Sequence, residues 1–429
     1  MNKKIKIALL GFGTVGTGVY KLINKQKESF CHKVGAEIEI SKILVRNKNK
    51  ERPELLHKEL LTDDWQEIIQ DEEIEIIVEV MGGIEPAKTY ILEALKAGKN
   101  VVTANKDLLA EYGRELLDTA HLKNKDLAFE ASVGGGIPII RPLKQCLAGN
   151  DIEEVMGIIN GTTNYILTKM TYENLSFGEA LAQAQELGYA EADPTSDIEG
   201  LDAARKLAIL ASIAFHSRVT FKDVYVEGIT KIALADIIYA QELGYVIKLV
   251  GLARQTVSGI EARVHPMFIR KSHPLAAVND SFNAVFVRGD AVGEAMFFGR
   301  GAGEMPTASA VLGDIIDVAR NIVNNCTGRI SCTCYYKSPV KNINEITSKY
   351  YLRLKAVDKP GVFASIAGVF GNHNVSLDSV IQKHRKENIA EIVIITDSVQ
   401  EKDFRDALQI IKGLSIVAEV SSVIRVGKD

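Results

Sequence analysis

The chain has 429 residues, of which 46% are hydrophobic and 25% are charged, and its formal net charge is −4. This length predicts two or three domains with sizeable cores, and the small charge gives no reason to expect a nucleic-acid partner. No apolar run in the sequence approaches the roughly 18 residues of a membrane span. The five cysteines are an odd number without C-x-x-C spacing, which indicates free thiols in a reducing compartment. We therefore expect a soluble, cytoplasmic protein without a membrane partner.

A glycine-rich turn follows the first apolar stretch. Ile5–Leu10 predicts a strand, a helix is expected up to about residue 25, and Gly11, Gly13 and Gly16 between them form G-x-G-x-x-G. In dinucleotide-binding folds the first glycine makes the tight turn and the second lets the backbone approach a pyrophosphate. The third lets helix and strand pack closely. The alternative is a glycine-rich turn that binds no ligand.

The second strand, expected at residues 36–45, ends in the basic segment Arg46-Asn47-Lys48. A site for NAD usually has Asp or Glu at this point to bind the ribose 2′-hydroxyl, whereas a basic end suits a 2′-phosphate. The sequence therefore favours NADP. The alternative is that Arg46 and Lys48 only begin a charged surface loop.

Strands expected at residues 74–81, 100–102 and 126–130 alternate with helices at 86–97 and 108–121. This alternation predicts a parallel, doubly wound sheet, in which ligands bind beyond the carboxyl ends of the strands. These ends carry Glu79, Gly82, Thr103, Lys106 and Glu130. Lys106 is thus a candidate for the cofactor or substrate pocket, and its alternative is an exposed loop lysine.

Three consecutive glycines, Gly134–Gly136, follow the strand-end Glu130. Glycines expose backbone carbonyl groups, and one carboxylate with several carbonyls is the ligand set of a hard cation. From composition alone, a plain hinge between domains is the favoured interpretation.

An acidic loop leads into a nearly apolar helix that is expected to run to Phe215. Ser196, followed three residues later by Glu199, has the form of a capping box, and Gly200 is taken as tolerated inside the helix. The loop carries four carboxylates, Glu191, Asp193, Asp197 and Glu199.

Asp202 and Lys206 lie four residues apart, so they share one face of this helix. An ordinary surface ion pair is one interpretation. The apolar flanks leave little room for a solvated face, however, and a partly buried Lys–Asp pair is a functional-site candidate. The lysine could protonate a developing oxyanion, and the carboxylates could hold a substrate ammonium group.

A mixed domain with a sheet is expected next, followed by a second glycine-rich loop at residues 299–303 and a helix at 306–321 that returns to the first domain. From Tyr350 onward the pattern is βαββαβ, a ferredoxin-like order. The predicted fold is α/β. Its domains are a Rossmann-type NADP-binding domain (1–135, completed by a helix at about 305–325), a substrate-binding and dimerisation domain (136–304), a linker (326–348) and a ferredoxin-like regulatory domain (349–429).

Several segments together resemble the homoserine dehydrogenase family, and the resemblance covers essentially the whole chain. They are G-F-G-T-V-G, T-A-N-K, E-A-S-V-G-G-G-I-P, G-I-I-N-G-T-T-N-Y-I-L and the acidic motif G-Y-A-E-A-D-P-T-S-D-I-E-G-L-D-A-A-R-K. The acidic motif is highly specific, whereas the glycine fingerprint alone is not. The C-terminal part, with D-K-P-G at its first turn, resembles an ACT domain. No kinase segment precedes these motifs, so the resemblance is to the monofunctional form.

The resemblance implies interconversion of L-aspartate 4-semialdehyde and L-homoserine with NADP(H), or with NAD(H), on the route to threonine, isoleucine and methionine. It also implies a sodium ion, a homodimer or homotetramer, and feedback by threonine through the ACT domain. Two rival interpretations are another Rossmann semialdehyde or amino-acid dehydrogenase and an inactive sensor of NADPH or threonine.

The resemblance assigns roles to individual residues. Lys206 would donate the proton with help from Lys106, and Glu191, Asp202 and Gly188 would bind the substrate. The cofactor would contact Gly11, Phe12, Gly13, Thr14, Val15, Gly16, Arg46, Thr103, Lys106, Gly188 and Gly303. Sodium would be held by Glu130 and by backbone oxygens of Val133, Gly135 and Ile137. In the ACT-like part, Asp358, Gly361 and Asn374 are candidate effector contacts by motif position.

Overall fold

The structure, a computed structural model, describes residues 3–52, 54, 57–330, 332–386 and 388–427; Ser331, in the predicted linker, lies outside the described residues. The chain forms two compact units. Unit 1 comprises residues 1–155, 205–223 and 283–338, and unit 2 comprises residues 156–204, 224–282 and 339–429. The division falls inside strand β7 (Ile152–Ile158) and inside helix α9 (Leu201–Ala214). Across the described ranges, none of the helices has the length and apolar composition that a bilayer crossing requires.

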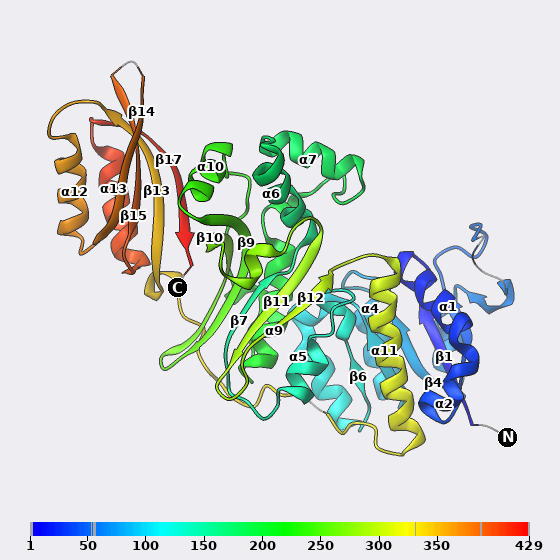
Figure 1. The fold of residues 1–429 in the computed structure, drawn as a ribbon. Coiled ribbons are helices and arrows are strands. Elements are labelled where there is room, and N and C mark those ends of the chain that lie inside the picture. Colours follow the sequence, from blue (N-terminus) through cyan, green and yellow to red (C-terminus); the bar gives the residue numbers. More distant parts are fainter. Residues whose placement is uncertain (1–2, 53, 55–56, 331, 387, 428–429) are drawn as a thin grey trace. The chain divides into compact units, whose positions relative to one another are not determined.

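Unit 1 contains a parallel sheet with the strand order β3-β2-β1-β4-β5-β6 (Figure 1). This is the order of a Rossmann dinucleotide-binding fold, in which the order reverses beside β1, and the predicted doubly wound sheet is confirmed. Its central strands are buried on both faces, as their apolar sequences require. The strands are β1 (Lys4–Leu10), β2 (Glu37–Leu44), β3 (Leu61–Thr62), β4 (Ile74–Glu79), β5 (Asn100–Thr103) and β6 (Leu127–Ala128).

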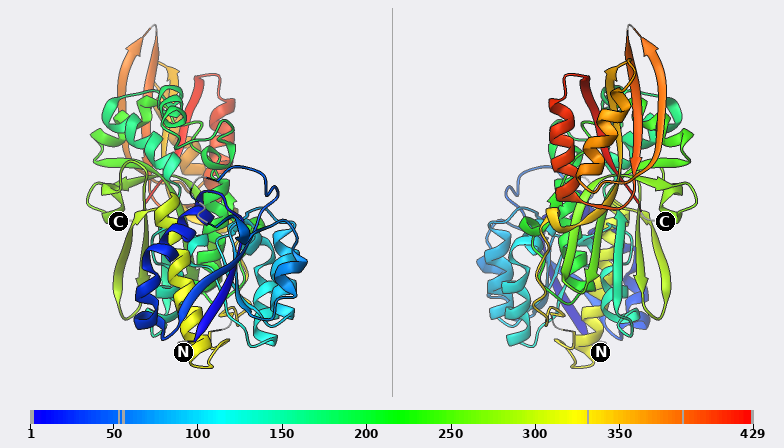
Figure 2. Two further views of the ribbon diagram at one scale, coloured as in Figure 1. Left: turned by 90° about the vertical axis from the view of Figure 1, so that its right-hand side faces the viewer. Right: turned by 90° about the vertical axis from the view of Figure 1, so that its left-hand side faces the viewer.

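Helices cover both faces of this sheet (Figure 2, left). Helix α11 (Glu304–Val323) comes from a distant part of the chain and packs along α1 (Thr14–Gln26), with Gly18 at their closest approach. A Cβ on Gly18 would lie 2.8 Å from the Glu304 carbonyl oxygen, so glycine is needed there. The other elements of unit 1 include α2 (Phe30–Val34), α3 (Gln66–Ile69), α4 (Ala87–Lys96), α5 (Lys106–Leu122), a π-helical turn (Pro142–Cys146), β11 (Phe282–Gly289) and β12 (Gly293–Arg300).

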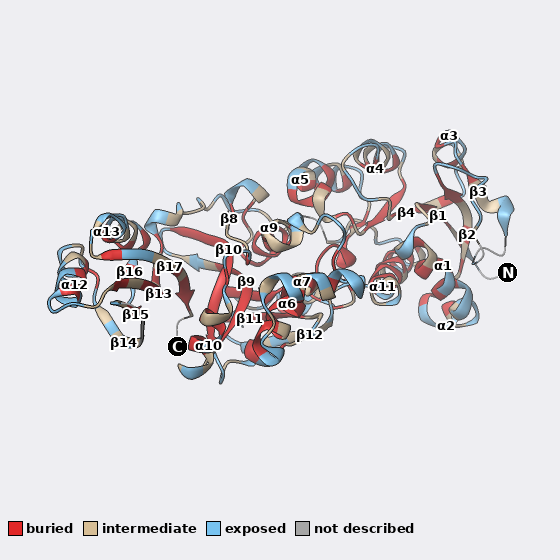
Figure 3. Cartoon of the chain, turned by 90° about the horizontal axis from the view of Figure 1, so that it is seen from above, coloured by how far each residue is buried: buried red, intermediate tan, exposed pale blue. Residues whose placement is uncertain are grey.

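Unit 2 contains a mixed sheet in which the order β9-β10-β17-β13-β15-β14 can be followed. Strand β10 (Gly259–Arg270) is buried along almost its whole length, and it is red in Figure 3. It pairs antiparallel with β9 (Tyr245–Thr256) and parallel with β17 (Val417–Val426). Helices of this unit are α6 (Gly161–Glu173), α7 (Phe177–Glu186), α8 (Thr195–Ile198) and α10 (Leu234–Glu242), and the short strand β8 (Tyr225–Val226) pairs with β10.

The last part of unit 2 has the predicted βαββαβ order of an ACT domain, and this prediction is confirmed. Its core is formed by one face of each helix and by the alternating inward side chains of the strands. The parallel β10–β17 pairing continues this sheet into the rest of unit 2. The elements are β13 (Thr347–Val357), α12 (Val362–Asn372), β14 (Leu377–Lys386), β15 (Ile389–Thr396), the short β16 (Val399–Gln400), α13 (Glu401–Gly413) and β17.

The acidic segment differs from its prediction in one respect. A single helix beginning at Ser196 was expected, with Gly200 inside it; instead α8 ends at Ile198 and α9 begins at Leu201. Gly200 has a φ of +80°, which ends α8. A Cβ on Gly228 would lie 2.4 Å from the Ile198 carbonyl oxygen, so the segment after β8 packs tightly against this break.

Candidate active site

The glycine-rich turn joins β1 to α1, and its three glycines meet different requirements. Gly11 has a φ of +104°, a conformation that glycine adopts readily. A Cβ on Gly16 would lie 2.3 Å from the Gly11 carbonyl oxygen, so only glycine lets α1 approach the turn this closely. A Cβ on Gly13 would meet no heavy atom of the described residues within 4 Å. The turn is therefore tightly packed at its first and third glycines and open at its second.

The open position at Gly13 suits the pyrophosphate of a dinucleotide. Gly13 is the N-cap of α1, and it and Thr14 are exposed, so an anion there is stabilised by the free N–H groups of the helix start. Phe12 packs edge-on against Tyr20, with ring centroids 5.6 Å apart, and Val15 is half-buried. The residues present thus fit the phosphate groups of the predicted cofactor.

The basic end of β2 contains one lysine that is already paired. Lys48 forms an ion pair with Asp63, with Nζ and Oδ1 2.8 Å apart. Arg46 is exposed just beyond β2, and the neighbouring Val45 N–H donates to the Thr62 carbonyl oxygen at 2.9 Å. Arg46, rather than Lys48, is therefore the better candidate for a phosphate contact.

A buried carboxylate organises the ends of β4 and β5. Glu79 is fully buried; it accepts hydrogen bonds from the N–H groups of Met81 and Gly82 at 2.9 and 3.1 Å and from the Thr103 hydroxyl at 2.6 Å. Burial raises the pKa of Glu79. The Thr103 hydroxyl oxygen in turn accepts the Asn105 N–H at 3.0 Å. Glu79 therefore fixes the two strand ends relative to each other.

Asn105 extends this network to the start of α5. Its side-chain amide donates to the Gly83 carbonyl oxygen at 2.6 Å, and its Oδ1 accepts the Leu108 N–H at 3.1 Å, which caps the helix. Lys106, the first residue of α5, is half-buried directly after this cap. In the sequence, Thr103 was predicted as a cofactor contact, Glu79 was noted only as a strand-end residue, and Asn105 was given no role; the N-cap preference of Asn before a helix was the signal available.

The helices that carry the two candidate lysines are joined by an ion pair. Arg205 Nε lies 3.1 Å from Asp107 Oδ1, and the Arg205 guanidinium also lies 4.8 Å from the centre of the Phe221 ring. Asp107 follows Lys106 in α5, and Arg205 precedes Lys206 in α9. Lys206 is half-buried. Within unit 1, this contact fixes the start of α5 against α9 beside both lysines, and sequence alone did not indicate it.

The carboxylate of Glu130, one of the predicted sodium residues, already accepts hydrogen bonds on both of its oxygens. One oxygen accepts the N–H groups of Ile139 and Ile140 at 2.6 and 2.7 Å, and the other accepts the backbone N–H and Nε of Arg141 at 2.8 and 3.1 Å. Four N–H donors occupy the lone pairs that a cation would need. The carboxylate of Glu130 instead anchors the loop that follows.

The remaining predicted sodium residues lie in a buried turn of unit 1. Val133, Gly135 and Ile137 are all buried, and Gly135 has a φ of +54°. A Cβ on Gly135 would lie 2.4 Å from the Gly301 carbonyl oxygen, so this turn packs directly on the second glycine-rich loop. Over the described ranges, no group of three or more His, Cys, Asp or Glu side chains is arranged to hold a metal ion. A cation at this turn would have to be held by backbone carbonyl groups.

Unit 2 holds Asp202 in a buried polar network at the start of α9. The side-chain amide of Asn160 donates to Asp202 Oδ2 at 2.9 Å and to Asp197 Oδ1 at 2.7 Å. Asn160 Oδ1 accepts the Thr163 N–H at 2.9 Å and so caps α6. The Thr162 hydroxyl donates to Asp197 Oδ2 at 3.1 Å or to the Tyr189 carbonyl oxygen at 2.7 Å. Asp202 is only 7% exposed, so Asn160 orients a carboxylate that water hardly reaches.

Two other predicted substrate residues lie in the loop before α8. Glu191 is exposed, and its carbonyl oxygen accepts a hydrogen bond from Gln185 Nε2 at 3.1 Å. Gly188 is exposed with a φ of +74°, and a Cβ there would meet no described heavy atom within 4 Å. In unit 1, Gly303 is the exposed N-cap of α11 with a φ of +115°. Both glycines leave room for a ligand.

The predicted residues thus fall into two groups. Unit 1 contains the glycine turn, Arg46, Thr103, Lys106, Lys206 and Gly303, and unit 2 contains Gly188, Glu191 and Asp202. Helix α9 belongs to both groups, since Asp202 and Lys206 are four residues apart in it. The first group can bind a dinucleotide and supply cationic side chains; the second can bind an ammonium group. The orienting residues Asn160 and Thr162 were seen in the sequence only as a polar loop.

The chain was compared with known protein families and solved structures. Residues 11–130 match the model of the homoserine dehydrogenase NAD-binding domain, residues 138–316 match the homoserine dehydrogenase model, and residues 350–415 match the ACT domain. The homoserine dehydrogenase of Bacillus subtilis is 46% identical over 426 residues, which cover 99% of this chain and 98% of that protein.

Solved structures give the same result. A homoserine dehydrogenase from Thiobacillus denitrificans is 41% identical and superposes with a TM-score of 0.94, with 100% of both chains covered. A hyperthermophilic archaeal homoserine dehydrogenase in complex with NADPH is 29% identical with a TM-score of 0.63, covering 73% of this chain and 97% of that one.

The Rossmann sheet, its open glycine turn and the NAD-binding match define a dinucleotide-dependent oxidoreductase with an ACT domain. The chain belongs to the homoserine dehydrogenase family. The resemblance noted in the sequence is thereby confirmed.

Proposed function

We propose that the protein reduces L-aspartate 4-semialdehyde to L-homoserine with NADPH, and catalyses the reverse reaction with NADP. The observation that carries this proposal is helix α9, in which Asp202, oriented by Asn160, precedes Lys206 by one turn. At this spacing the carboxylate can bind the amino group of a substrate, and the ammonium group can donate a proton to its reacting oxygen.

NADPH, when bound at the glycine turn, supplies the hydride to the aldehyde carbon. The aldehyde oxygen then gains negative charge, and the Lys206 ammonium group stabilises and protonates it. General-acid catalysis of this kind contributes about 10²–10⁴-fold, and a fixed positive charge adds electrostatic stabilisation. Lys106, fixed by the Asn105 cap, contributes a second positive charge.

Glu191 and Asp202 bind the α-ammonium group of the substrate and fix its orientation. Asp202 is the stronger anchor because its Oδ2 accepts the Asn160 amide in a buried setting, where hydrogen bonds to a charged group are strong. Gly188 is an open, positive-φ position that leaves space for the substrate, and Gly303, also at positive φ, is exposed at the start of α11.

The preference for NADP rests on Arg46. Its exposed position beyond β2, with the neighbouring Lys48 already paired to Asp63, leaves Arg46 to bind a 2′-phosphate. The NADPH bound to the archaeal relative supports this preference. NAD(H) is the alternative cofactor. The sodium ion that the family resemblance implies would be held by backbone carbonyls of residues 130–137, and no step of the proposed reaction depends on it.

The ACT domain supports regulation by an amino acid, and we propose threonine as the effector of this step toward threonine, isoleucine and methionine. Gly361, with a φ of +85°, caps α12, and Asn374, with a φ of +57°, follows that helix. With Asp358, which accepts a hydrogen bond from Gln382 at 3.4 Å, they are the proposed effector contacts. A homodimer or homotetramer is the assembly that the resemblance supports.

The test is NADPH oxidation with aspartate semialdehyde by wild type, Lys206→Ala and the matched variant Lys222→Ala, which changes an exposed lysine of unit 1. We expect Lys206→Ala to lose at least about 10²-fold in kcat with NADPH affinity unchanged, and Lys222→Ala to behave as wild type. Parallel loss of NADPH affinity and turnover would remove Lys206 from the proton-donor role. A wild type without turnover would favour the sensor alternative.

A further inference from the structure

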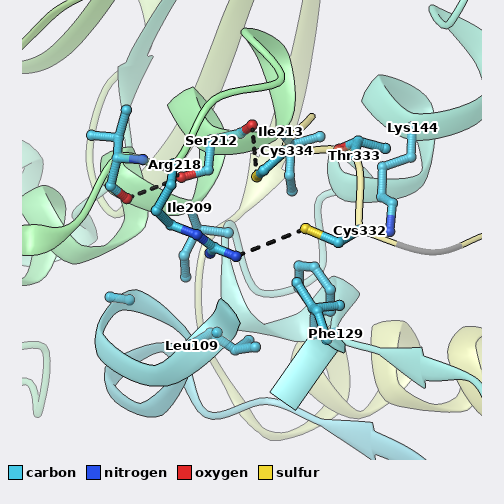
Figure 4. Close-up of a pocket in the computed structure, with 14 residues that line it drawn as sticks. Leu109, Phe129, Lys144, Ile209, Ser212, Ile213, Arg218, Cys332, Thr333 and Cys334 are labelled. Atoms are coloured by element: carbon cyan, nitrogen blue, oxygen red, sulfur yellow. Dashed lines mark hydrogen bonds between the residues drawn. The ribbon is translucent and has the colours of Figure 1, made fainter. Parts of the chain in front are cut away.

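Two cysteines of unit 1 lie at a small internal cavity that the proposed reaction does not use. The cavity has a volume of about 30 Å³, and Cys332, Thr333 and Cys334 form one of its walls. The facing walls come from α5 and α9 (Figure 4). A volume of this size holds about one water molecule, so the cavity suits a reaction of the side chains themselves rather than a bound metabolite.

The sulfur of Cys332 lies beside cationic side chains. Arg218 Nη2 donates to it at 3.8 Å. Lys144 lines the same cavity (Figure 4), and the described residues of its lining include no carboxylate. The neighbouring Cys334, with the charges of Arg218 and Lys144, lowers the pKa of Cys332.

Arg218 forms no ion pair with a carboxylate among the residues that the structure describes. Its Nε is buried and lacks a hydrogen-bond partner among the described residues, and its Nη2 donates to Cys332. Arg218 is half-buried, and a nearby anion would stabilise a guanidinium group whose Nε is buried and unpaired. A Cys332 thiolate supplies that anion, so the structure favours the ionised, nucleophilic form of this cysteine.

Cys334 is placed as the partner thiol. Its thiol donates to the Ser212 carbonyl oxygen of α9, which lies 3.4 Å from Cys334 Sγ. The nearby Cys332 and burial raise the pKa of Cys334. Residues two apart span at most roughly 7 Å, and disulfides need Cα atoms about 4.4–6.8 Å apart. The chain can therefore close a Cys332–Cys334 bond with a local adjustment.

We propose that Cys332 and Cys334 form a peroxide-sensitive dithiol, in which Cys332 is the nucleophile and Cys334 resolves the product to a disulfide. The Cys332 thiolate attacks one peroxide oxygen, the O–O bond breaks, and hydroxide leaves, which gives a sulfenic acid. The sulfur of Cys334 then attacks the sulfenic sulfur, the S–O bond breaks, and the Cys334 proton leaves with hydroxide as water. In total, two thiols and one hydrogen peroxide give one disulfide and two waters.

The first test is peptide mapping of the reduced full-length protein after treatment with one equivalent of hydrogen peroxide. We expect the wild-type peptide with both cysteines to lose two hydrogen atoms. Cys334→Ser should accumulate a sulfenic acid at Cys332 that dimedone traps, and Cys332→Ser should leave Cys334 reduced. Oxidation that begins at the exposed Cys146, or a disulfide that still forms from Cys334 in Cys332→Ser, would overturn the assignment.

The second test is the rate of alkylation by iodoacetamide as a function of pH, with Cys146 as the exposed control in the same molecule. Thiolate fraction raises this rate, so at pH 6.5 Cys332 should react several-fold faster than Cys146. The Arg218→Met variant should remove most of this advantage. Equal rates at Cys332 and Cys146 would mean that the donors around Cys332 do not ionise it.

A consequence for turnover rests on the proposed function. The disulfide removes the Cys334 hydrogen bond to Ser212, which lies in the same helix as Lys206, so we expect oxidised protein to turn over more slowly and thiol reductant to restore it. Unchanged turnover in fully oxidised protein would overturn this link to α9. Peptide mapping does not depend on catalysis, so its result stands whether or not the proposed reaction is correct.

Discussion

Each unit of the protein contains a cluster of carboxylates around an arginine. The pKa of one acid is lowered in the first cluster and that of another acid is raised in the second. In unit 2, Arg425 is only 5% exposed and donates to Glu227 at 2.7 Å and to Glu401 at 2.6 Å. Glu401 also accepts hydrogen bonds from Arg405 at 2.9 Å and from the Tyr350 hydroxyl. Although burial alone would raise the pKa of Glu227, Arg425 lowers it.

In unit 1, one arginine forms ion pairs with two carboxylates that are both fully buried. Arg141 Nε lies 3.1 Å from Glu130 and 3.5 Å from Asp314, and its side chain is 35% exposed. Asp314 Oδ2 also accepts the Glu130 N–H at 2.7 Å. Burial raises the pKa of Asp314 to about 7, because Arg141 offsets only part of the cost and Glu130 adds a like charge.

The two clusters differ in charge balance and in the exposure of the acid whose pKa is shifted: the Glu227 side chain is 38% exposed and that of Asp314 is 2% exposed. The unit 2 cluster has two arginines for two carboxylates, and it connects the ACT domain to the segment after β8. The unit 1 cluster has one arginine for two carboxylates, so near neutral pH one acid exchanges a proton. A charge-balanced cluster should be insensitive to pH and costly to break, whereas an unbalanced one should be pH-dependent and easier to relax.

Arg425→Met should have the largest effect. Removing one partner from a buried ion pair costs about 3–5 kcal/mol, because Glu401 stays buried with fewer donors. The loss of unfolding free energy should be similar at pH 6 and pH 8, since Arg405 and Tyr350 still donate hydrogen bonds to Glu401. Urea unfolding followed by circular dichroism measures it. Arg405→Met, whose side chain is 41% exposed, is the control and should cost at most about 1 kcal/mol.

Asp314→Asn should change how stability depends on pH. The folded-state pKa of Asp314 is about 7, above the ~3.9 of an unfolded Asp. Its contribution to stability is therefore fully present below pH 4 and is lost as pH rises through 7. Asn does not titrate, so between pH 5 and pH 8 wild type should lose roughly 2–3 kcal/mol relative to the variant.

The measurement can be confined to unit 1. Trp65 is the single tryptophan of the chain, is buried, and stacks on Tyr90 with ring centroids 4.5 Å apart. Its fluorescence in urea therefore reports the unfolding of unit 1. Parallel pH profiles for wild type and Asp314→Asn would show that Asp314 is an ordinary ionised acid, and the contrast between the clusters would fail.

Arg141→Met tests whether the unbalanced cluster can relax. Glu130 keeps three backbone N–H donors, and Asp314 can take up a proton. We expect a cost of about 1–2 kcal/mol at pH 8 and less at pH 6, where protonation compensates for the lost charge. Trp65 fluorescence in urea at both pH values measures it. A cost as large as that of Arg425→Met, or one that grows at pH 6, would contradict this explanation.

Local sequence was sufficient for much of the fold. Each glycine of the first turn had a role that could be assigned from its spacing, and the βαββαβ order of the ACT domain followed from short apolar segments between turns. Gly200 shows the limit. It has a positive φ at the point where Gly228, 28 residues away, packs against Ile198, and a pattern of neighbouring residues does not reveal this contact.

Long-range electrostatic partners were the part of the candidate site that sequence could not supply. Glu130 was a candidate cation ligand because a carboxylate beside glycines is a local pattern. In the structure its carboxylate accepts hydrogen bonds from Arg141 and from backbone N–H groups after Ile137. Its contact with Asp314 joins residues 184 positions apart. Arg205 and Asp107, which fix the two lysine-bearing helices, are likewise distant in sequence. Such pairs depend on how elements pack, and nothing in either local sequence selects its partner.

Glu227→Gln should have the smallest effect, and it completes the comparison because its sign is opposite to that of Asp314. The pKa of Glu227 is lowered in the folded protein, so its charge stabilises the fold above an unfolded pKa of ~4.3 and this stability is lost as pH falls. Its side chain is 38% exposed, so solvent screening limits the cost to at most about 1 kcal/mol at pH 7. Urea unfolding followed by circular dichroism at pH 7 and pH 4 should show the variant approaching wild type at the lower pH. If the unfolding free energy of the variant rose relative to that of wild type as pH rises, Glu227 would depend on pH as Asp314 does. Charge balance would then not explain the difference between the two clusters.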